Sequence, residues 1–79
     1  MILVEGAKGE RVKALQQALK DKGFDPGEID GDFGPGTEAA VLAFQRSEGL
    51  LADGKAGPQT LGALGLEVLP EDTRPDATA

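Results

Sequence analysis

One eight-residue stretch occurs twice in the sequence, as Asp30-Gly31-Asp32-Phe33-Gly34-Pro35-Gly36-Thr37 and, 23 residues later, as Asp53-Gly54-Lys55-Ala56-Gly57-Pro58-Gln59-Thr60. Five of the eight positions are identical, so both copies read Asp-Gly-x-x-Gly-Pro-x-Thr. The aspartate can accept hydrogen bonds from backbone N–H groups two or three residues on, and the first glycine can take the positive φ of a turn. Proline suits the first position of a helix, where its missing N–H would have had no partner. The pattern therefore predicts a tight loop before each of two helices, with the threonine hydroxyls closing their first turns.

Apolar periodicity around these loops predicts three helices. Over Gly9–Lys22, Val12, Leu15 and Leu19 fall at i, i+3 and i+7, the spacing of an amphipathic helix. Pro35–Glu48 and Pro58–Leu64 are expected to be the other two, each with the glycine before its proline as N-cap. A glycine follows each helix, and for the first two an apolar residue follows the glycine, as in a Schellman ending (Gly23-Phe24, Gly49-Leu50 and Gly65).

The predicted fold is therefore all-α, a small three-helix bundle in one domain at residues 1–66. Residues 67–79 contain two prolines and acidic residues without an apolar period, which is typical of a tail or linker, although Val68-Leu69 can still dock. A short pairing by Ile2–Val4 is the only sheet-like structure expected. The large apolar side chains expected in the core are Val12, Leu15, Leu19, Phe24, Ile29, Phe33, Val41, Phe44, Leu50, Leu61 and Leu64.

Composition argues against several classes of function. The absence of cysteine and histidine removes disulfide scaffolds, thiol nucleophiles, cysteine-containing zinc sites and imidazole bases. Eight lysines and arginines against fourteen acidic residues, a net charge of −6, argue against binding of the nucleic-acid backbone. The opening Met1-Ile2-Leu3-Val4 is too short for a membrane span or a secretion signal. We expect no cofactor, no metal and a monomer.

A second repeat, Val12-x-x-Leu15-Gln16 and Val41-x-x-Phe44-Gln45, links the first two predicted helices. Together with the two loops and Gly49-Leu50, it resembles the peptidoglycan-binding domain found in many bacterial and phage cell-wall hydrolases. The resemblance runs from about Leu3 to Leu64. It implies a three-helix bundle that holds peptidoglycan without cleaving it, while a hydrolase domain outside this chain does the chemistry.

Two specific functions of the acidic loop, calcium binding and glycoside cleavage, are disfavoured by the spacing of its residues and by the small size of the core. Asp30 and Asp32 are spaced like the first calcium ligands of an EF-hand, but Gly34 and Pro35 then occupy the positions of a ligand and of the invariant glycine. A glycosidase pair from Glu28, Asp30 and Asp32 would need a cleft that so small a core cannot supply. We therefore expect no enzymatic activity in this chain.

Sugar recognition commonly uses exposed aromatic side chains, yet Trp and Tyr are absent and the three Phe fall at core positions. Hydrogen bonding to peptidoglycan is therefore expected from the first loop and the second helix, with Arg46 as the best partner for a stem-peptide carboxylate. The predicted binding residues are Asp30, Gly31, Asp32, Gly34, Thr37, Gln45 and Arg46.

Two functions remain open from the sequence. The first is a module that anchors a partner domain to the cell wall, in the wall, the periplasm or outside the cell. The alternative is a protein–protein interaction module in a phage or secretion assembly, which the net negative charge favours slightly because wall polymers are commonly anionic. Fold does not decide between them.

Overall fold

The computed structural model describes residues 2–66, and Met1 and residues 67–79 fall outside that description. It contains three helices, α1 (Glu10–Asp21), α2 (Pro35–Glu48) and α3 (Pro58–Ala63). The predicted all-α fold is confirmed, and each helix lies within one residue of its predicted bounds. The predicted tail at 67–79, with the docking of Val68-Leu69, lies outside the described residues, so the boundary at residue 66 stays a prediction.

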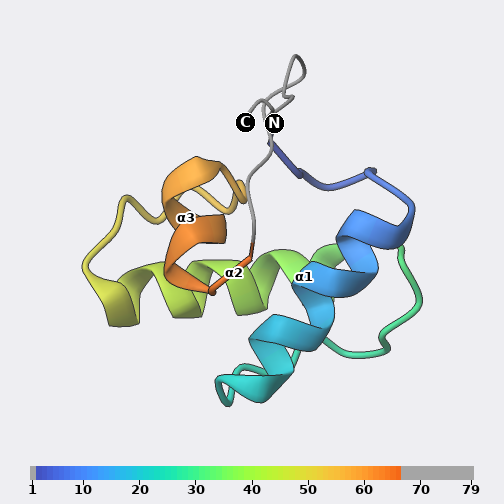
Figure 1. Cartoon of the computed structure of the whole chain (residues 1–79), viewed down its shortest axis with the longest axis horizontal. Coiled ribbons are helices and arrows are strands. Elements are labelled where there is room, and N and C mark those ends of the chain that lie inside the picture. The colour runs from blue at the N-terminus through green and yellow to red at the C-terminus, as the bar shows by residue number, and fades with distance from the viewer. Residues whose placement is uncertain (1, 67–79) are drawn as a thin grey trace, which may run out of the picture.

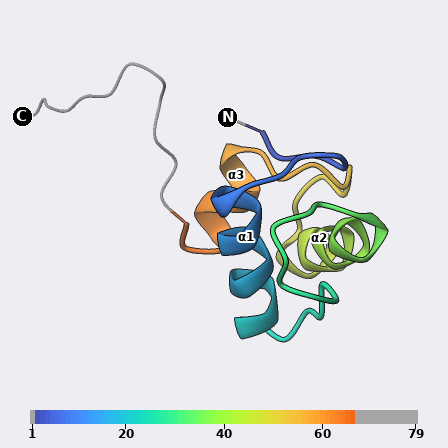
Figure 2. The ribbon, with the colours of Figure 1, turned by 90° about the vertical axis from the view of Figure 1, so that its right-hand side faces the viewer.

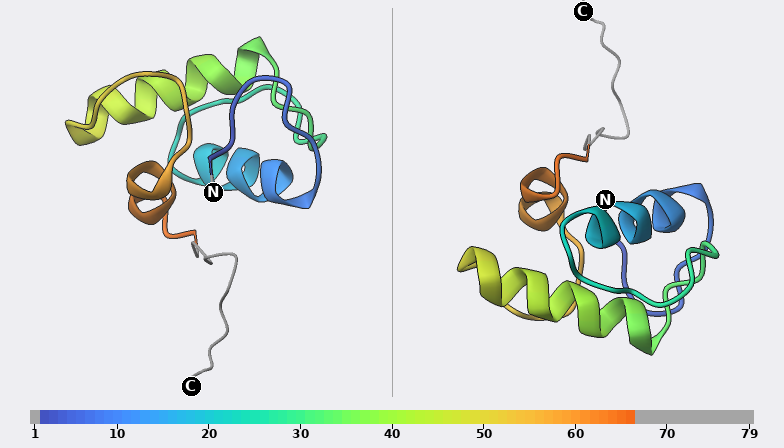
Figure 3. Two further views of the ribbon diagram at one scale, coloured as in Figure 1. Left: turned by 90° about the horizontal axis from the view of Figure 1, so that it is seen from above. Right: turned by 90° about the horizontal axis from the view of Figure 1, so that it is seen from below.

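The longest helix, α2, lies along one side of the other two helices. Seen from the side in Figure 1, α2 runs across the molecule. When it is viewed nearly end-on in Figure 2, or from above and below in Figure 3, α1 and α3 both lie on the same side of it. The first loop leads into one end of α2, and the second loop leads from its other end to α3.

All three helices end in the same way, with a glycine at positive φ followed by an apolar residue. The backbone N–H of that apolar residue donates to the carbonyl five residues earlier, the long-range bond of a Schellman motif. These bonds join Phe24 to Leu19 (2.8 Å), Leu50 to Gln45 (2.8 Å) and Leu66 to Leu61 (2.9 Å). The prediction from the Gly-apolar pairs is confirmed, and α3 follows the same rule.

The segment before α1 joins the two loops to each other. Leu3 exchanges two backbone hydrogen bonds with Ala56 of the second loop, at 3.0 and 2.8 Å. Further along the segment, Ala7 accepts from the N–H of Phe33, and Gly9 donates to the Gly31 carbonyl, both at 2.9 Å. The expected pairing by Ile2–Val4 is confirmed, though as isolated bridges rather than a strand.

The core lies where the three helices and the N-terminal segment meet. Its fully buried apolar residues are Leu3, Val12, Leu15, Leu19, Phe33, Ala40, Val41, Phe44, Ala56, Leu61 and Leu64. Three predicted core residues, Phe24, Ile29 and Leu50, are only partly buried and lie on connecting loops. Phe24 still packs edge-on against Phe44, with ring centroids 5.6 Å apart.

Gly31 and Gly54 occupy the same position in the two loops and have φ angles of 81° and 75°. Replacing either with valine is expected to lower the free energy of unfolding by more than about 1 kcal/mol, because a β-branched residue is strained at positive φ. A Cβ at Gly31 would also stand 3.2 Å from the Gly9 carbonyl oxygen. Thermal unfolding followed by circular dichroism measures the effect.

Gly62 supplies the control, since it lies inside α3 and an added Cβ there would meet nothing within 4 Å. Gly62→Ala is expected to raise the thermal midpoint, because alanine favours a helix interior by roughly 0.5–1 kcal/mol over glycine. Unchanged midpoints for both valine variants would contradict the assignment of the two turns.

Candidate functional site

The first loop is organised around the buried side-chain amide of Gln16, which projects from α1 and is 1% exposed. Its Nε2 donates to Asp30 Oδ1 (3.2 Å), to the Asp32 carbonyl (2.9 Å) and to Thr37 Oγ1 (3.0 Å). Its Oε1 accepts from the backbone N–H of Gly31 at 2.9 Å. One amide thus ties α1, the loop and the first turn of α2 together.

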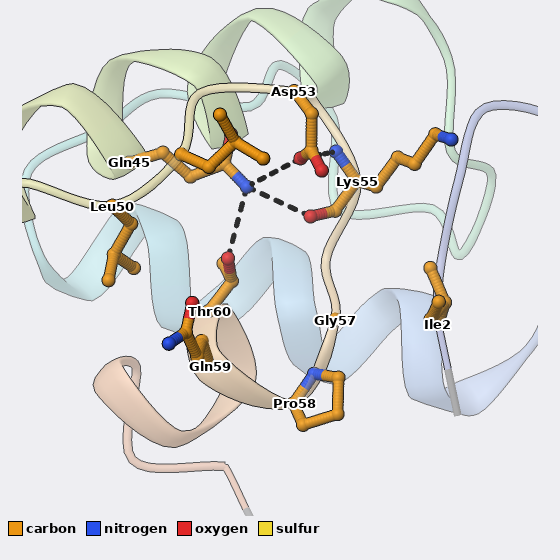
Figure 4. Close-up of a pocket in the computed structure, with 10 residues that line it drawn as sticks. Ile2, Gln45, Leu50, Asp53, Lys55, Gly57, Pro58, Gln59 and Thr60 are labelled. Atoms are coloured by element: carbon orange, nitrogen blue, oxygen red, sulfur yellow. Dashed lines mark hydrogen bonds between the residues drawn. The ribbon is translucent and has the colours of Figure 1, made fainter.

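The second loop repeats this arrangement around Gln45, which projects from α2 and is also 1% exposed. As Figure 4 shows, its Nε2 donates to Asp53 Oδ1 (3.2 Å), the Lys55 carbonyl (2.9 Å) and Thr60 Oγ1 (3.0 Å). Its Oε1 accepts from the N–H of Gly54 at 3.0 Å. The sequence repeat is therefore a structural repeat in which each bond of the first loop has its counterpart in the second.

The aspartates of both loops are held in their charged form. The backbone N–H of Asp32 and then the Gln16 amide donate to Asp30, which lowers the pKa of that carboxyl below its ordinary value of 3.8. The backbone N–H of Lys55 does the same for Asp53 and lowers its pKa, with smaller help from Gln45 and the Lys55 charge. Hydrogen bonds to a carboxylate favour ionisation in this way.

Each loop borders a hollow on the surface. The first, of about 240 Å³, is lined by Gln16, Pro26, Gly27, Glu28, Asp30, Asp32, Gly34, Gly36 and Thr37. The second, of about 310 Å³ and drawn in Figure 4, is lined by Ile2, Gln45, Leu50, Leu51, Asp53, Lys55, Gly57, Pro58, Gln59 and Thr60. A glutamine, an aspartate and a threonine at corresponding positions line each hollow, and most of the other lining residues differ between the two.

The structure brings together only some of the predicted binding residues. Asp30, Asp32, Gly34 and Thr37 all line the first hollow, and Gly31 is buried beneath it. Gln45 does not border this loop: its amide bonds to the second loop, because the register of α2 places Gln45 near the other end of the helix. Arg46 is exposed beside it in the last turn of α2 and lines neither hollow.

Two further details differ from the sequence analysis. Gln16, which is absent from the predicted binding residues, is the centre of the first loop. Its signal was the repeated apolar-Gln pair, Leu15-Gln16 and Phe44-Gln45, at the same point of each amphipathic pattern. The threonine hydroxyls do not cap their helices, since neither α2 nor α3 has a side-chain cap bond. They accept instead from the glutamine amides.

Glu28, Asp30 and Asp32, which were weighed as a carboxylate pair, do meet at the first hollow. Within residues 2–66, however, no three acidic side chains are grouped closely enough to hold a metal ion. In the same part of the chain, no helix is long and apolar enough to cross a membrane.

Comparison with known proteins identifies the family. The family model described as "Putative peptidoglycan binding domain" matches residues 8–64, which include both loops, both glutamines and all three helices. This chain belongs to that family. The resemblance drawn from the glycine loops is thereby confirmed, and the matched residues are those that form the two hydrogen-bonded repeats.

Individual relatives of this peptidoglycan-binding family member are similar in sequence and fold. N-acetylmuramoyl-L-alanine amidase CwlM of Mycobacterium tuberculosis is 48% identical over 56 residues, 71% of this chain and 14% of that protein. The crystal structure of the SleB N-terminal domain has a TM-score of 0.80 at 45% identity, covering 82% of this chain and 89% of that one. A periplasmic domain of the EpsAB fusion protein of the Vibrio vulnificus type II secretion system has a TM-score of 0.74 at 31% identity, covering 89% and 32%.

The chain corresponds to only one part of its longer relatives. Three curated relatives that are each 48% identical are matched over 14%, 25% and 23% of their own length. This chain thus spans at most a quarter of the length of these relatives.

Replacing Gln16 or Gln45 with methionine, which has a similar length, is expected to lower the free energy of unfolding by more than about 2 kcal/mol. Each change leaves a buried glycine N–H and several acceptors without their partner, and an unsatisfied buried group costs roughly 1–3 kcal/mol. Urea unfolding measures the loss. Gln17→Met is the matched control, because Gln17 is an exposed neighbour whose one side-chain bond, to Asp21, is also exposed. A loss no larger than that control's would contradict the role of the amides.

The lowered pKa values of Asp30 and Asp53 predict a stability that depends on pH. A carboxyl whose folded pKa is depressed adds stability above its unfolded pKa of about 3.9, and this is lost as pH falls through the folded pKa. The thermal midpoint is therefore expected to fall as the pH is lowered from about 4 toward 2. Asp30→Asn and Asp53→Asn keep an acceptor oxygen but do not titrate, so together they should make that fall shallower. Glu5→Gln controls for the change in net charge. Parallel curves of thermal midpoint against pH for the unaltered domain, the combined aspartate variant and Glu5→Gln would contradict the prediction.

Proposed function

We propose that this domain binds bacterial peptidoglycan without cleaving it and holds a partner domain, outside this chain, on the cell wall. The observation that carries the proposal is the family match over residues 8–64. The relation to the amidase supports it, because a domain that corresponds to 14% of that enzyme is suited to targeting rather than to the reaction. The proposed location is the wall, the periplasm or the cell exterior.

The setting of Asp30 in the first hollow does not suit a catalytic general acid. A glycosidase needs one carboxyl with a raised pKa to act as general acid. Asp30 has a lowered pKa, because its Oδ1 accepts hydrogen bonds from the Asp32 N–H and from Gln16. The hydrogen bonds that build the loop thus work against the chemistry that a catalytic acid requires.

The binding surface that the sequence favours, the first loop with Arg46, stays a prediction. Asp30 and Asp32 are exposed there, and the guanidinium of Arg46 has the geometry to bind a stem-peptide carboxylate through two hydrogen bonds. Gly31, Thr37 and Gln45 are buried, so their part in binding would be to shape the loops rather than to touch the polymer.

A second candidate function is docking within a secretion assembly. It is favoured by the likeness to the periplasmic domain of the type II secretion fusion protein, at 31% identity and a TM-score of 0.74. The net charge of −6 favours it as well, because an anionic polymer is repelled at low salt. On this alternative the same bundle presents its surface to a protein.

Sedimentation with purified insoluble peptidoglycan is expected to carry the domain into the pellet and to release no soluble wall fragments. Retention should persist or increase as salt is raised, because salt screens the repulsion between two anionic partners. The protein without wall material is the control for aggregation. A domain that remains in the supernatant at every salt concentration would refute wall binding and support the second candidate, whereas released muropeptides would refute the non-catalytic role.

A further inference from the structure

The two hollows have the same hydrogen-bonded framework but different electrostatic character. The first carries three carboxylates, Glu28, Asp30 and Asp32, and none of its lining residues is basic. In the second, Lys55 takes the place that Asp32 has in the first copy, so the lining contains one lysine and one aspartate. An anionic group is therefore repelled at the first hollow and tolerated or attracted at the second.

The second hollow also has an apolar rim that the first lacks. Leu51, two residues before Asp53, is 77% exposed, whereas the residue two before Asp30 is Glu28. Across the hollow lies Ile2, which is 57% exposed and approaches Gly57, where an added Cβ would be 3.9 Å from Ile2 Cγ1. Ile2 and Leu51 are two of the three large apolar residues exposed within residues 2–66. Both of them line this one hollow.

The polar groups of this hollow divide into a floor and a rim. Gln45 and Thr60 bond to each other and to the loop, so they form a fixed floor, as Figure 4 shows. Gln59 and Lys55 are exposed at the rim, where their side chains can reach a ligand. A volume of about 310 Å³ lies at the small end of the usual range for ligand pockets, about 300–1,000 Å³. It suits the end of a peptide better than a chain of sugars.

A glycan strand is the less suitable occupant of this site. The chain has no Trp or Tyr, Phe33 and Phe44 are buried, and Phe24 packs against Phe44. The hollow therefore offers no aromatic face on which a sugar ring could stack.

We propose that the hollow beside the second loop, rather than the first, binds the end of a peptidoglycan stem peptide, with Lys55 at its terminal carboxylate and Ile2 and Leu51 around its aliphatic side chain. This proposal rests on the proposed function. It gives the two copies of the loop different tasks, since the first supports the fold and the second also carries the ligand.

The test is titration of the ¹⁵N-labelled domain with three soluble probes, followed by NMR. The probes are a muramyl pentapeptide ending in D-alanine, the same molecule with its terminal carboxylate amidated, and the peptide-free disaccharide. The pentapeptide is expected to shift the amide signals of Leu51–Thr60 and of Ile2, and the disaccharide is not. Lys55→Gln should weaken the pentapeptide about three- to tenfold, the effect of losing a partly exposed charge-assisted hydrogen bond. Amidation should weaken binding to the unaltered domain similarly and cause no further loss in Lys55→Gln.

Lys13→Gln is the matched control, because it removes one positive charge from an exposed position on α1 and is expected to bind as the unaltered domain does. Shifts confined to Asp30–Thr37, tighter binding of the disaccharide, or a loss in Arg46→Ala with none in Lys55→Gln would each overturn the proposal. Insoluble peptidoglycan separates this failure from that of the function. Wall retention that is as strong for Lys55→Gln as for the unaltered domain refutes only this site, whereas no retention of the unaltered domain refutes wall binding itself.

Discussion

A glutamine amide can be buried only if its hydrogen bonds are satisfied, and the fold depends on meeting that requirement twice. Gln16 and Gln45 are each 1% exposed, and burying an unpaired amide would cost several kcal/mol. Each finds a backbone N–H for its oxygen and three acceptors for its nitrogen, all within a single loop and the helix that follows it. The loops are consequently held in place by side chains of α1 and α2 rather than by a β-sheet.

The N-terminal segment makes these two separate units into one domain. Its backbone bonds from Leu3 to Ala56 and from Gly9 to Gly31 join loops that lie far apart in the sequence. Leu3 and Ala56 are buried where they meet, so the same contact also closes the core. A chain of 79 residues has little apolar surface to bury. In this arrangement, part of the core is covered by backbone whose N–H and C=O groups are hydrogen-bonded to each other.

Local signals were sufficient to predict the helices, because proline starts and glycine stops act within a few residues. The bounds of α2 follow from Pro35 and Gly49 without any knowledge of the rest of the fold. Burial of Leu3 and Ala56 was not predictable in this way, since it arises from a pairing across more than fifty residues of sequence. The burial of Gln16 and Gln45 was not predicted for another reason. Polarity assigns them to the surface, and only their place in the internal repeat indicates that they are buried.

The first hollow could be located from its sequence, whereas the properties that distinguish the second could not. Asp30, Asp32, Gly34 and Thr37 lie so close together in the sequence that a single loop brings them to one hollow. The second hollow takes Ile2 from the N-terminal segment and Leu51 from the loop after α2, and no local pattern brings these two residues to one hollow.

Internal duplication allows the parts of a loop that maintain the fold to be separated from those that are free to differ. The positions shared by both copies, the aspartate, the glycines and the threonine, together with the two glutamines, are occupied with internal hydrogen bonds or turn geometry. At the differing positions that reach the surface, the side chains neither make internal hydrogen bonds nor set the geometry of the turn. Asp32 and Lys55 use only backbone atoms in the loop network, and Gly36 and Gln59 are exposed. Because the framework does not use the side chains of Asp32, Lys55 and Gln59, a change in them alters surface charge and apolarity without disturbing the bundle. Gly36 is the exception, since an added Cβ there would stand 3.0 Å from the Pro26 carbonyl oxygen. In a domain this small, the exposed side chains at the rim of a loop can therefore bind a ligand while the buried groups of the same loop stabilise the fold.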